Sequence, residues 1–298
     1  MTVVVGTSPT HHTAEGIHLG ALLARSVDAD LVIVCVIPSP WEERGVGIDR
    51  DHLDLLTERA KTSVDELTRV IPDDLRWRVV VLESPSVSIG LLEAIEHFEA
   101  SWLVLGSSTA GLLGRVALGG VTERLLHSAP VPVAVAPRGF TAGPDARLER
   151  VSVGFVAAPD ESALVLNAAE MAASVGARLR LASFAARPPG PETSGIGLHA
   201  EDDVIDVWAA GLAEAAAGLQ GEVAALAQAP AQEDPVIGRG PTWISALESV
   251  PWSAGDVLVV GSSRTARVAH VFLGGTASKI ARHSPVPVIV VPRGAIER

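Results

Sequence analysis

The sequence has few aromatic residues, one cysteine and no long apolar run. Aromatic residues make up 4% of its 298 residues and tyrosine is absent, which argues against a base-stacking surface for single-stranded nucleic acid. The one cysteine, Cys35, leaves no disulfide framework and no cluster of cysteine metal ligands. It lies in an apolar stretch and is expected to be a small core residue. No apolar run reaches the roughly 18–20 residues that a membrane-spanning helix needs.

Positive charge is also scarce. The chain has 23 Lys and Arg against 35 Asp and Glu, a formal net charge of −12, so nucleic acid would be repelled. Nothing near the N-terminus resembles a signal peptide, because the apolar stretch Val3–Val5 is short and no positive charge precedes it. We therefore expect a cytoplasmic protein that binds neither nucleic acid nor membrane.

The abundant hydrophobic residues, 48% of the chain, build an internal repeat. Leu103-Val-Leu-Gly106-Ser-Ser and Leu258-Val-Val-Gly261-Ser-Ser both continue to a Gly-Gly pair and then to Pro-Val-Pro-Val. Each matching pair of glycines is 155 residues apart along the chain. A gapless match of this kind predicts two copies of one domain, residues 1–142 and 148–298, joined by a short polar link.

Each half alternates expected strands and helices. The first half has expected strands at Thr2–Val5, Leu31–Ile37, Arg76–Leu82, Trp102–Leu105 and Val131–Ala136. Helices are expected between them, at 14–27, 51–70, 86–97 and 121–127, and the second half repeats the pattern with a long helix at 202–226 and a short third strand at Val236–Gly238. The alternation predicts an α/β fold with two doubly wound, five-stranded parallel sheets. In such sheets ligands bind at the carboxyl ends of the strands, near the point where the strand order reverses.

Glycines mark that place in both halves. Gly106 and Gly261 directly follow a buried strand, and a Gly-Gly pair precedes each next helix. Glycine tolerates positive φ and lets the backbone approach a ligand closely. The N–H groups at the start of a helix favour an anion. We therefore expect a phosphate between the two glycine positions.

These motifs resemble the universal stress protein domain, and the resemblance covers nearly the whole chain, twice. Nucleotide-binding members of that family show Gly-x-x-Gly, nine residues, and then Gly-Ser or Gly-Thr. Gly106 and Gly119 match the outer glycines, whereas Thr109 and Gly120 stand where the family has its second glycine and its hydroxyl. In the second half Arg264 replaces that second glycine, where it would either crowd a phosphate or pair with it. The resemblance implies an adenine nucleotide, ATP, as the candidate ligand.

A second departure lies at the end of the first strand, where nucleotide-binding members carry an Asp. Its place falls at Gly6 or Ser8 in the first half and at Val156 in the second. Whether ATP binds is therefore left open, with domain 1 favoured because Thr7 and Ser8 keep polar groups there. The candidate contacts are Ser8, Val36, Gly106, Thr109, Gly119, Gly120, Val121, Gly261, Arg264, Gly274 and Gly275.

No set of residues predicts catalysis. The chain has neither a Gly-x-Ser-x-Gly elbow nor a Gly-x-x-x-x-Gly-Lys-Ser/Thr loop, and nothing predicts a metal site. His11 and His12 lack evident partners and are expected to be exposed at a helix start. His270 is expected in a solvated loop, with an approach to an anion as the alternative, and Asp160 is expected to cap a helix. Two functions stay open: a stress and signalling protein that acts by binding nucleotide, or a relative that has lost nucleotide and acts through an unknown protein partner.

The resemblance also implies an assembly. In this family the last strands of two domains pair antiparallel, which here would join Val131–Ala136 to Val286–Val291. Each would otherwise be an exposed apolar edge strand, and such edges invite pairing. The apolar composition and the habit of tandem members further predict that the chain forms a homodimer.

Overall fold

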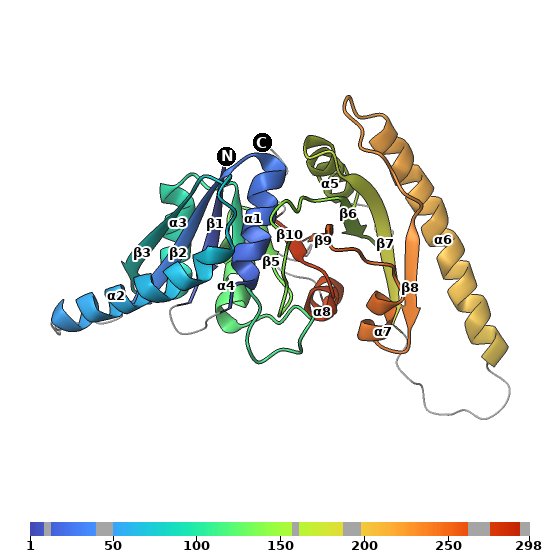
Figure 1. Cartoon of the computed structure of the whole chain (residues 1–298). Helices are drawn as coiled ribbons and strands as arrows, with labels where there is room; N and C mark the ends of the chain where they lie inside the picture. The colour runs from blue at the N-terminus through green and yellow to red at the C-terminus, as the bar shows by residue number, and fades with distance from the viewer. Residues whose placement is uncertain (9–12, 40–49, 157–160, 187–197, 262–274, 293–298) are drawn as a thin grey trace.

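The computed structural model describes residues 1–8, 13–39, 50–156, 161–186, 198–261 and 275–292. In both halves, strands alternate with helices, as the sequence predicts (Figure 1). The first half contains β1 (Thr2–Thr7), α1 (Glu15–Val27), β2 (Asp30–Pro38), α2 (Arg50–Leu67) with the 3-10 turn η2 (Thr68–Val70), β3 (Trp77–Ser84), α3 (Val87–His97), β4 (Trp102–Leu105), α4 (Gly120–Ser128) and β5 (Val133–Val135). The second half contains β6 (Arg150–Gly154), α5 (Ser162–Ser174), β7 (Arg178–Ala186), α6 (Leu198–Ala224), β8 (Val236–Gly240), α7 (Trp243–Glu248), β9 (Asp256–Gly261), α8 (Gly275–His283) and β10 (Val288–Val291).

The two five-stranded sheets join into one sheet of ten strands, in the order β3-β2-β1-β4-β5-β10-β9-β6-β7-β8. The strands within each half run parallel. β5 and β10 meet antiparallel at the centre, with Ala134 opposite Ile289 (Figure 1). The predicted pairing of the last strands is therefore confirmed, and each strand covers the edge that the other would expose.

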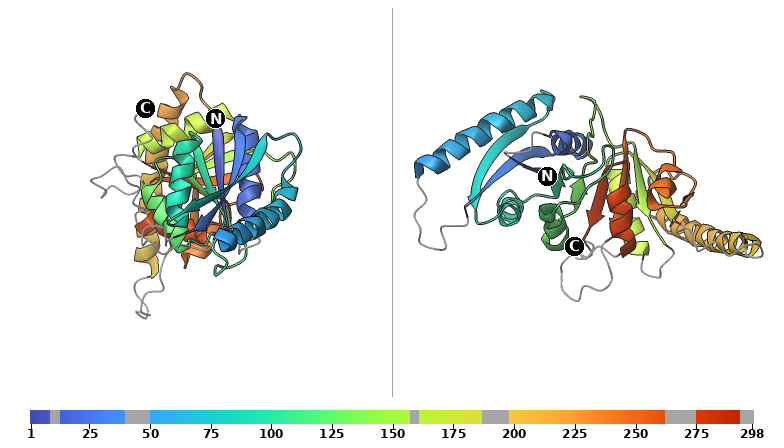
Figure 2. Two further views of the ribbon diagram at one scale, coloured as in Figure 1. Left: turned by 90° about the vertical axis from the view of Figure 1, so that its left-hand side faces the viewer. Right: turned by 90° about the horizontal axis from the view of Figure 1, so that it is seen from below.

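Helices cover both faces of this sheet (Figure 2). Successive strand residues point to opposite faces, so Val3 and Val5 pack in one buried cluster and Val4 in the other. The first cluster lies under α1, α2, α5 and α6, and the second under α3, α4, α7 and α8. Cys35 is fully buried in the first cluster, as expected for a core residue. Along the described residues, no helix combines the length and hydrophobicity of a membrane span.

The last strand of the first half is shorter than predicted. It was expected over Val131–Ala136, but β5 covers only Val133–Val135. Pro132 and Pro137 flank it, and proline has no N–H to donate to a sheet. The third strands are longer than predicted, and β8 extends to Gly240.

The polar link between the halves lies against α1. The Leu148 amide donates to Ser26 Oγ at 2.8 Å, and the Arg147 guanidinium donates to the carbonyl of Arg25. Leu148 itself is buried. The link therefore packs against the first domain.

Candidate functional site

A cavity of about 370 Å³ opens at the carboxyl ends of β1 and β4. These strands are neighbours in the sheet, but the chain leaves β1 toward β2 on one side and continues from β4 to β5 on the other. The cavity therefore lies at the switch point of the first half, where doubly wound sheets place their ligands.

The cavity brings together every candidate contact predicted in the first half. They come from the ends of β1 and β2, the loop after β4 and the start of α4. They are Ser8, Val36, Gly106, Thr109, Gly119, Gly120 and Val121. Their role as ligand contacts remains a prediction.

Sequence reasoning missed the contribution of α1 and α3. Thr13, Gly16 and Ile17 line the cavity from the start of α1, and Val87 and Leu91 line it from α3. Nothing in the glycine motif points to either helix, because both reach the cavity only through packing. Ser107 and Ser108 also line it, and their repetition as a Ser-Ser pair after both Gly106 and Gly261 was a signal available in the sequence.

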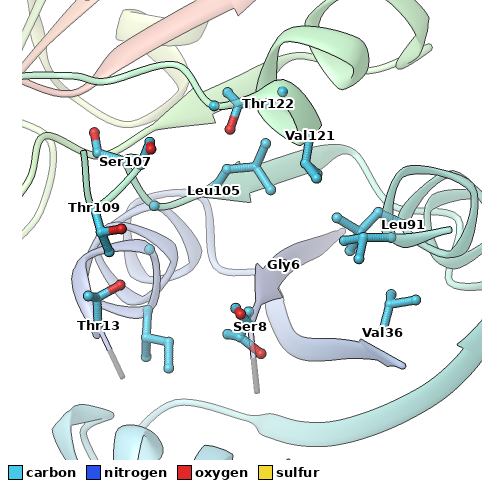
Figure 3. A pocket seen from close by; sticks show the side chains of 18 residues that line it. Gly6, Ser8, Thr13, Val36, Leu91, Leu105, Ser107, Thr109, Val121 and Thr122 are labelled. Atoms are coloured by element: carbon cyan, nitrogen blue, oxygen red, sulfur yellow. The ribbon is translucent and has the colours of Figure 1, made fainter. Parts of the chain in front are cut away.

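The cavity has an apolar side and a hydroxyl-bearing side. Figure 3 shows Val36, Leu91 and Val121 toward one side, and Thr13 and Thr109 toward the other. All 18 residues that the structure describes around the cavity are uncharged. A flat heteroaromatic ring suits the apolar side, whereas backbone N–H groups and hydroxyls would have to meet an anion on the other.

The loop between β4 and α4 has an inner limb, which contains Ser107 and Ser108, and an outer limb, which contains Arg115, Val116 and Ala117. Hydrogen bonds join the two limbs. Ser107 Oγ accepts from the Ala117 amide at 2.9 Å and donates to the Ala136 carbonyl at 2.6 Å. The Ser108 amide donates to the Ala117 carbonyl at 2.8 Å. These bonds fix the limb that lines the cavity to the limb behind it.

The start of α4 presents backbone donors at the cavity. The first bond in the helix runs from the Glu123 amide to the Gly119 carbonyl at 2.8 Å. The amides of Gly120, Val121 and Thr122 thus precede the helical hydrogen-bond ladder, and all three residues line the cavity. With the helix dipole they form an electropositive wall suited to a phosphate.

The expectation that the loop glycines serve to adopt a positive φ is wrong for Gly119. Gly119 has φ −90° and ψ 170°, which any residue can adopt, and the described glycines with positive φ are Gly114, Gly139 and Gly176. A Cβ on Gly119 would lie 3.4 Å from Ser108 Cβ, which is an ordinary van der Waals distance. Neither backbone strain nor a clash within the chain requires glycine here, and a larger side chain would instead extend beside the loop that lines the cavity.

Packing disfavours an Asp at Gly6, one of its two candidate positions. A Cβ on Gly6 would lie only 2.9 Å from side-chain atoms of both Leu91 and Leu105, so a carboxylate there would have to displace the ends of two leucine side chains. Thr7 Oγ1 is directed into the sheet, where it donates to the Val34 carbonyl at 3.3 Å. Thr7 and Ser8 both line the cavity, so this strand end adds two hydroxyl-bearing residues to it, of which Thr7 is hydrogen-bonded to the sheet.

The second half differs at the matching place. Its described site residues are Gly261, which ends β9, and Gly275, which begins α8. A Cβ on Gly261 would meet the Leu164 side chain at 3.1 Å, whereas Gly106 faces the backbone of Gly16 at its closest point. Leu164 thus fills space that a glycine leaves open in the first half. Arg264, Gly274, His270, His11, His12 and Asp160 lie outside the described residues.

A carboxylate adds to this difference. The Val156 amide, just after β6, donates to both oxygens of Glu161 at 3.0 Å. Matching β6 to β1 and Leu164 to Gly16 puts Glu161 at the place of Thr13, which lines the first cavity. Negative charge here would oppose a phosphate.

Comparison with known proteins identifies the family. The family model described as the universal stress protein family matches residues 1–137 and again 148–292. The chain belongs to the universal stress protein family. Curated universal stress proteins of Mycobacterium bovis and Mycobacterium tuberculosis are 34% identical to it over 296 residues, which cover 98% of this chain and 100% of theirs. The chain is thus a tandem universal stress protein, as the repeat predicts.

Solved structures share the tandem fold. A universal stress protein from Archaeoglobus fulgidus matches 98% of this chain and 98% of its own, with a TM-score of 0.58 and 18% identity. A functionally unknown protein from Pseudomonas aeruginosa matches 99% of this chain and 93% of its own, with a TM-score of 0.58 and 16% identity. At these identities the likeness concerns the fold alone.

Proposed function

We propose that this tandem universal stress protein binds an adenine nucleotide, ATP, in the cavity of domain 1 and acts in the stress response through its bound state. The observation that carries the proposal is the convergence of seven predicted contacts from four segments on one cavity at the switch point. The protein needs no reaction of its own for this role, because binding alone can shift a population of states.

The cavity suggests a pose. The adenine ring would lie on the apolar side, between Val36 and Leu91. The phosphates would lie toward Gly119 and Gly120, where the N-terminal amides of α4 would donate to them. Gly120 replaces the hydroxyl of nucleotide-binding members, which removes one hydrogen bond worth about 0.5–1.5 kcal/mol.

Domain 2 is proposed to be silent. Leu164 occupies the space beside Gly261, and Glu161 adds a carboxylate at the end of β6. Val156, which stands at the place of the family's Asp, offers no polar side chain. We therefore propose that each chain binds one nucleotide. The protein is proposed to act in the cytoplasm.

A second candidate function is a universal stress protein that binds no nucleotide and acts through a protein partner. The observation that favours it is the packing of Gly6 beneath Leu91 and Leu105, which leaves β1 without the carboxylate of nucleotide-binding members. The two candidates differ in one measurable property, the affinity of the full chain for ATP.

Native mass spectrometry of the gently purified protein, followed by calorimetric titration with ATP, tests the proposal. We expect an adenine nucleotide to co-purify and Gly119→Val to abolish binding, because the valine methyl groups would extend from a Cβ already in contact with Ser108. Gly143→Val is the control, since a Cβ there meets nothing within 4 Å. The second function is favoured instead if the wild type neither carries nor binds nucleotide.

A further inference from the structure

The β4–α4 loop that lines the cavity of domain 1 is also held by domain 2. Its outer limb carries Arg115 and Val116, which lie against the end of α8 (Figure 1). The Val116 amide donates to the Ser284 carbonyl at 3.2 Å. Arg115 Nη1 donates to the His283 carbonyl at 3.2 Å. The loop of one domain thus binds the last carbonyls of a helix in the other.

These contacts satisfy groups that the helix itself cannot. The final carbonyls of an α-helix have no N–H donor within the helix, and they carry the negative end of its dipole, which favours a cation. The Arg115 side chain is 13% exposed and also pairs with Glu248 at the end of α7. Burial lowers the pKa of Arg115, and the carbonyl and carboxylate acceptors offset the cost of burying its charge. Two elements of domain 2 therefore converge on one side chain of domain 1.

The anchored limb is connected directly to the cavity. Ala117 follows Val116 and exchanges hydrogen bonds with Ser107 Oγ and with the Ser108 backbone. Ser107 and Ser108 line the cavity. A displacement of Arg115 and Val116 would thus be transmitted through one residue to the wall of the site.

We propose that domain 2 sets the ligand affinity of domain 1, with Arg115 as the positioning residue that holds the β4–α4 loop in its ligand-receiving form. The proposal rests on nucleotide binding by domain 1. Coupling is reciprocal, so occupancy of the cavity would in turn stabilise the contact of the loop with α7 and α8. In this arrangement the silent domain regulates the binding domain.

The test uses the full chain with ATP as the probe. Arg115→Ala removes the anchor from the loop, and Glu248→Gln removes the negative charge that pairs with Arg115 from domain 2 without touching the cavity. We expect ATP affinity to fall about fivefold or more in Arg115→Ala, in the range of ordinary coupling between sites, and to fall in the same direction in Glu248→Gln. Hydrogen exchange at the amides of Ser108, Val116 and Ala117 should quicken in both variants without ligand.

Arg282→Ala is the matched control. Arg282, on α8, pairs with Glu123 of α4 and also crosses between the domains, but its described hydrogen bonds go to Glu123 and Ser278 rather than to the loop. We expect its ATP affinity and its loop exchange to stay close to those of the wild type. Thermal unfolding of each variant checks that the fold is kept.

The outcomes separate this inference from the function on which it rests. A wild-type protein that binds no ATP overturns the proposed function, and the regulation falls with it. A wild type that binds, with Arg115→Ala and Glu248→Gln at the same affinity, overturns the regulation alone. An equal loss in Arg282→Ala also overturns it, because the effect would then come from the interface in general.

Discussion

Thr13 and Glu161 occupy matching places just before α1 and α5, and they illustrate how single residues distinguish the two sites. Thr13 lines the cavity of domain 1, whereas the Glu161 carboxylate accepts from the Val156 amide in domain 2. Replacing Thr13 by glutamate would put a negative charge in place of a neutral hydroxyl, on the side of the cavity where the phosphates are proposed to bind.

Thr13→Glu should weaken ATP binding by domain 1 roughly tenfold or more, because like charges a few ångströms apart repel by more than 1 kcal/mol at the dielectric of a protein surface. Titration calorimetry measures the change. Glu161→Thr is the matched control in domain 2 and should leave the affinity of domain 1 unaltered. An undiminished affinity in Thr13→Glu would place the phosphates elsewhere.

Residue-level reasoning from the sequence found the glycine loop but not its surroundings. The two loops match at an interval of 155 residues, while the first strands match at a shorter interval, from Thr2 to Arg150. The second strands keep the shorter interval, from Asp30 to Arg178, so the insertion lies later in the chain and Gly16 corresponds to Leu164. The contacts of Gly16 with Gly106 and of Leu164 with Gly261 agree with this correspondence, but that these helices reach the cavity becomes apparent only from the packing.

At the scale of elements, β6, β7 and β9 are joined by a buried ion cluster. Arg150 Nη2 donates to Asp256 Oδ2 at 2.6 Å, and the Ser253 amide donates to the same oxygen at 2.8 Å. Arg180 is 2% exposed, donates to Ser152 Oγ at 3.0 Å and lies under the Trp252 ring. Asp256 thus offsets two guanidinium groups in the interior of domain 2.

Asp256→Asn should destabilise the protein by about 3 kcal/mol, because it removes the buried carboxylate beside Arg150 and Arg180 and leaves Arg150 with the more exposed Glu233 as its acidic partner. Urea denaturation followed by circular dichroism measures the loss. Asp30→Asn is the control, since Asp30 pairs with Arg76 on the exposed rim of domain 1 and such pairs contribute little. Equal stabilities of the two variants would show that the cluster is not needed to hold the strands.

Strand and helix order followed from the hydrophobic pattern, because buried parallel strands such as β2 read as continuous apolar runs. The pairing of β5 with β10 could be expected from two apolar edges and from the family. The contact between the β4–α4 loop and α8 could not, because Arg115 and Glu248 are 133 residues apart in sequence. Their meeting depends on how two domains pack, which no local pattern encodes.

At the scale of the whole molecule, two half-buried histidines lie where the halves meet. Burial lowers the pKa of His18, against the effect of a hydrogen bond with the backbone of Ala142 in the link. Burial and the nearby Arg115 and Arg282 lower the pKa of His283. Both are therefore more readily protonated in the unfolded chain than in the folded one.

Stability should accordingly fall as the pH drops below about 6.5, the ordinary pKa of histidine, because the unfolded state then binds more protons. The loss of stability is complete once the pH lies below the pKa values that the two histidines have in the folded protein. Denaturation at a series of pH values should show a shallower dependence in His18→Gln and His283→Gln than in the wild type. If the stability of the variants depends on pH as steeply as that of the wild type, other groups cause the dependence.

The whole chain is also expected to form a homodimer, given its apolar composition and the habit of tandem relatives. Sedimentation at micromolar concentration should show a species of twice the 30.9 kDa chain mass. A clean monomer over that range would contradict the expectation. The internal pairing of β5 with β10 would be unaffected by either result.

The stoichiometry of ATP binding tests the central claim most directly, because the two halves share one fold and differ in their sites. Titration calorimetry on the full chain, with native mass spectrometry to count bound molecules, should give one nucleotide per chain. That single site should disappear in Gly119→Val. Two equivalent nucleotides per chain would contradict the assignment of Leu164 and Glu161 as features that disable domain 2, and none would contradict the assignment of domain 1 as the binding domain.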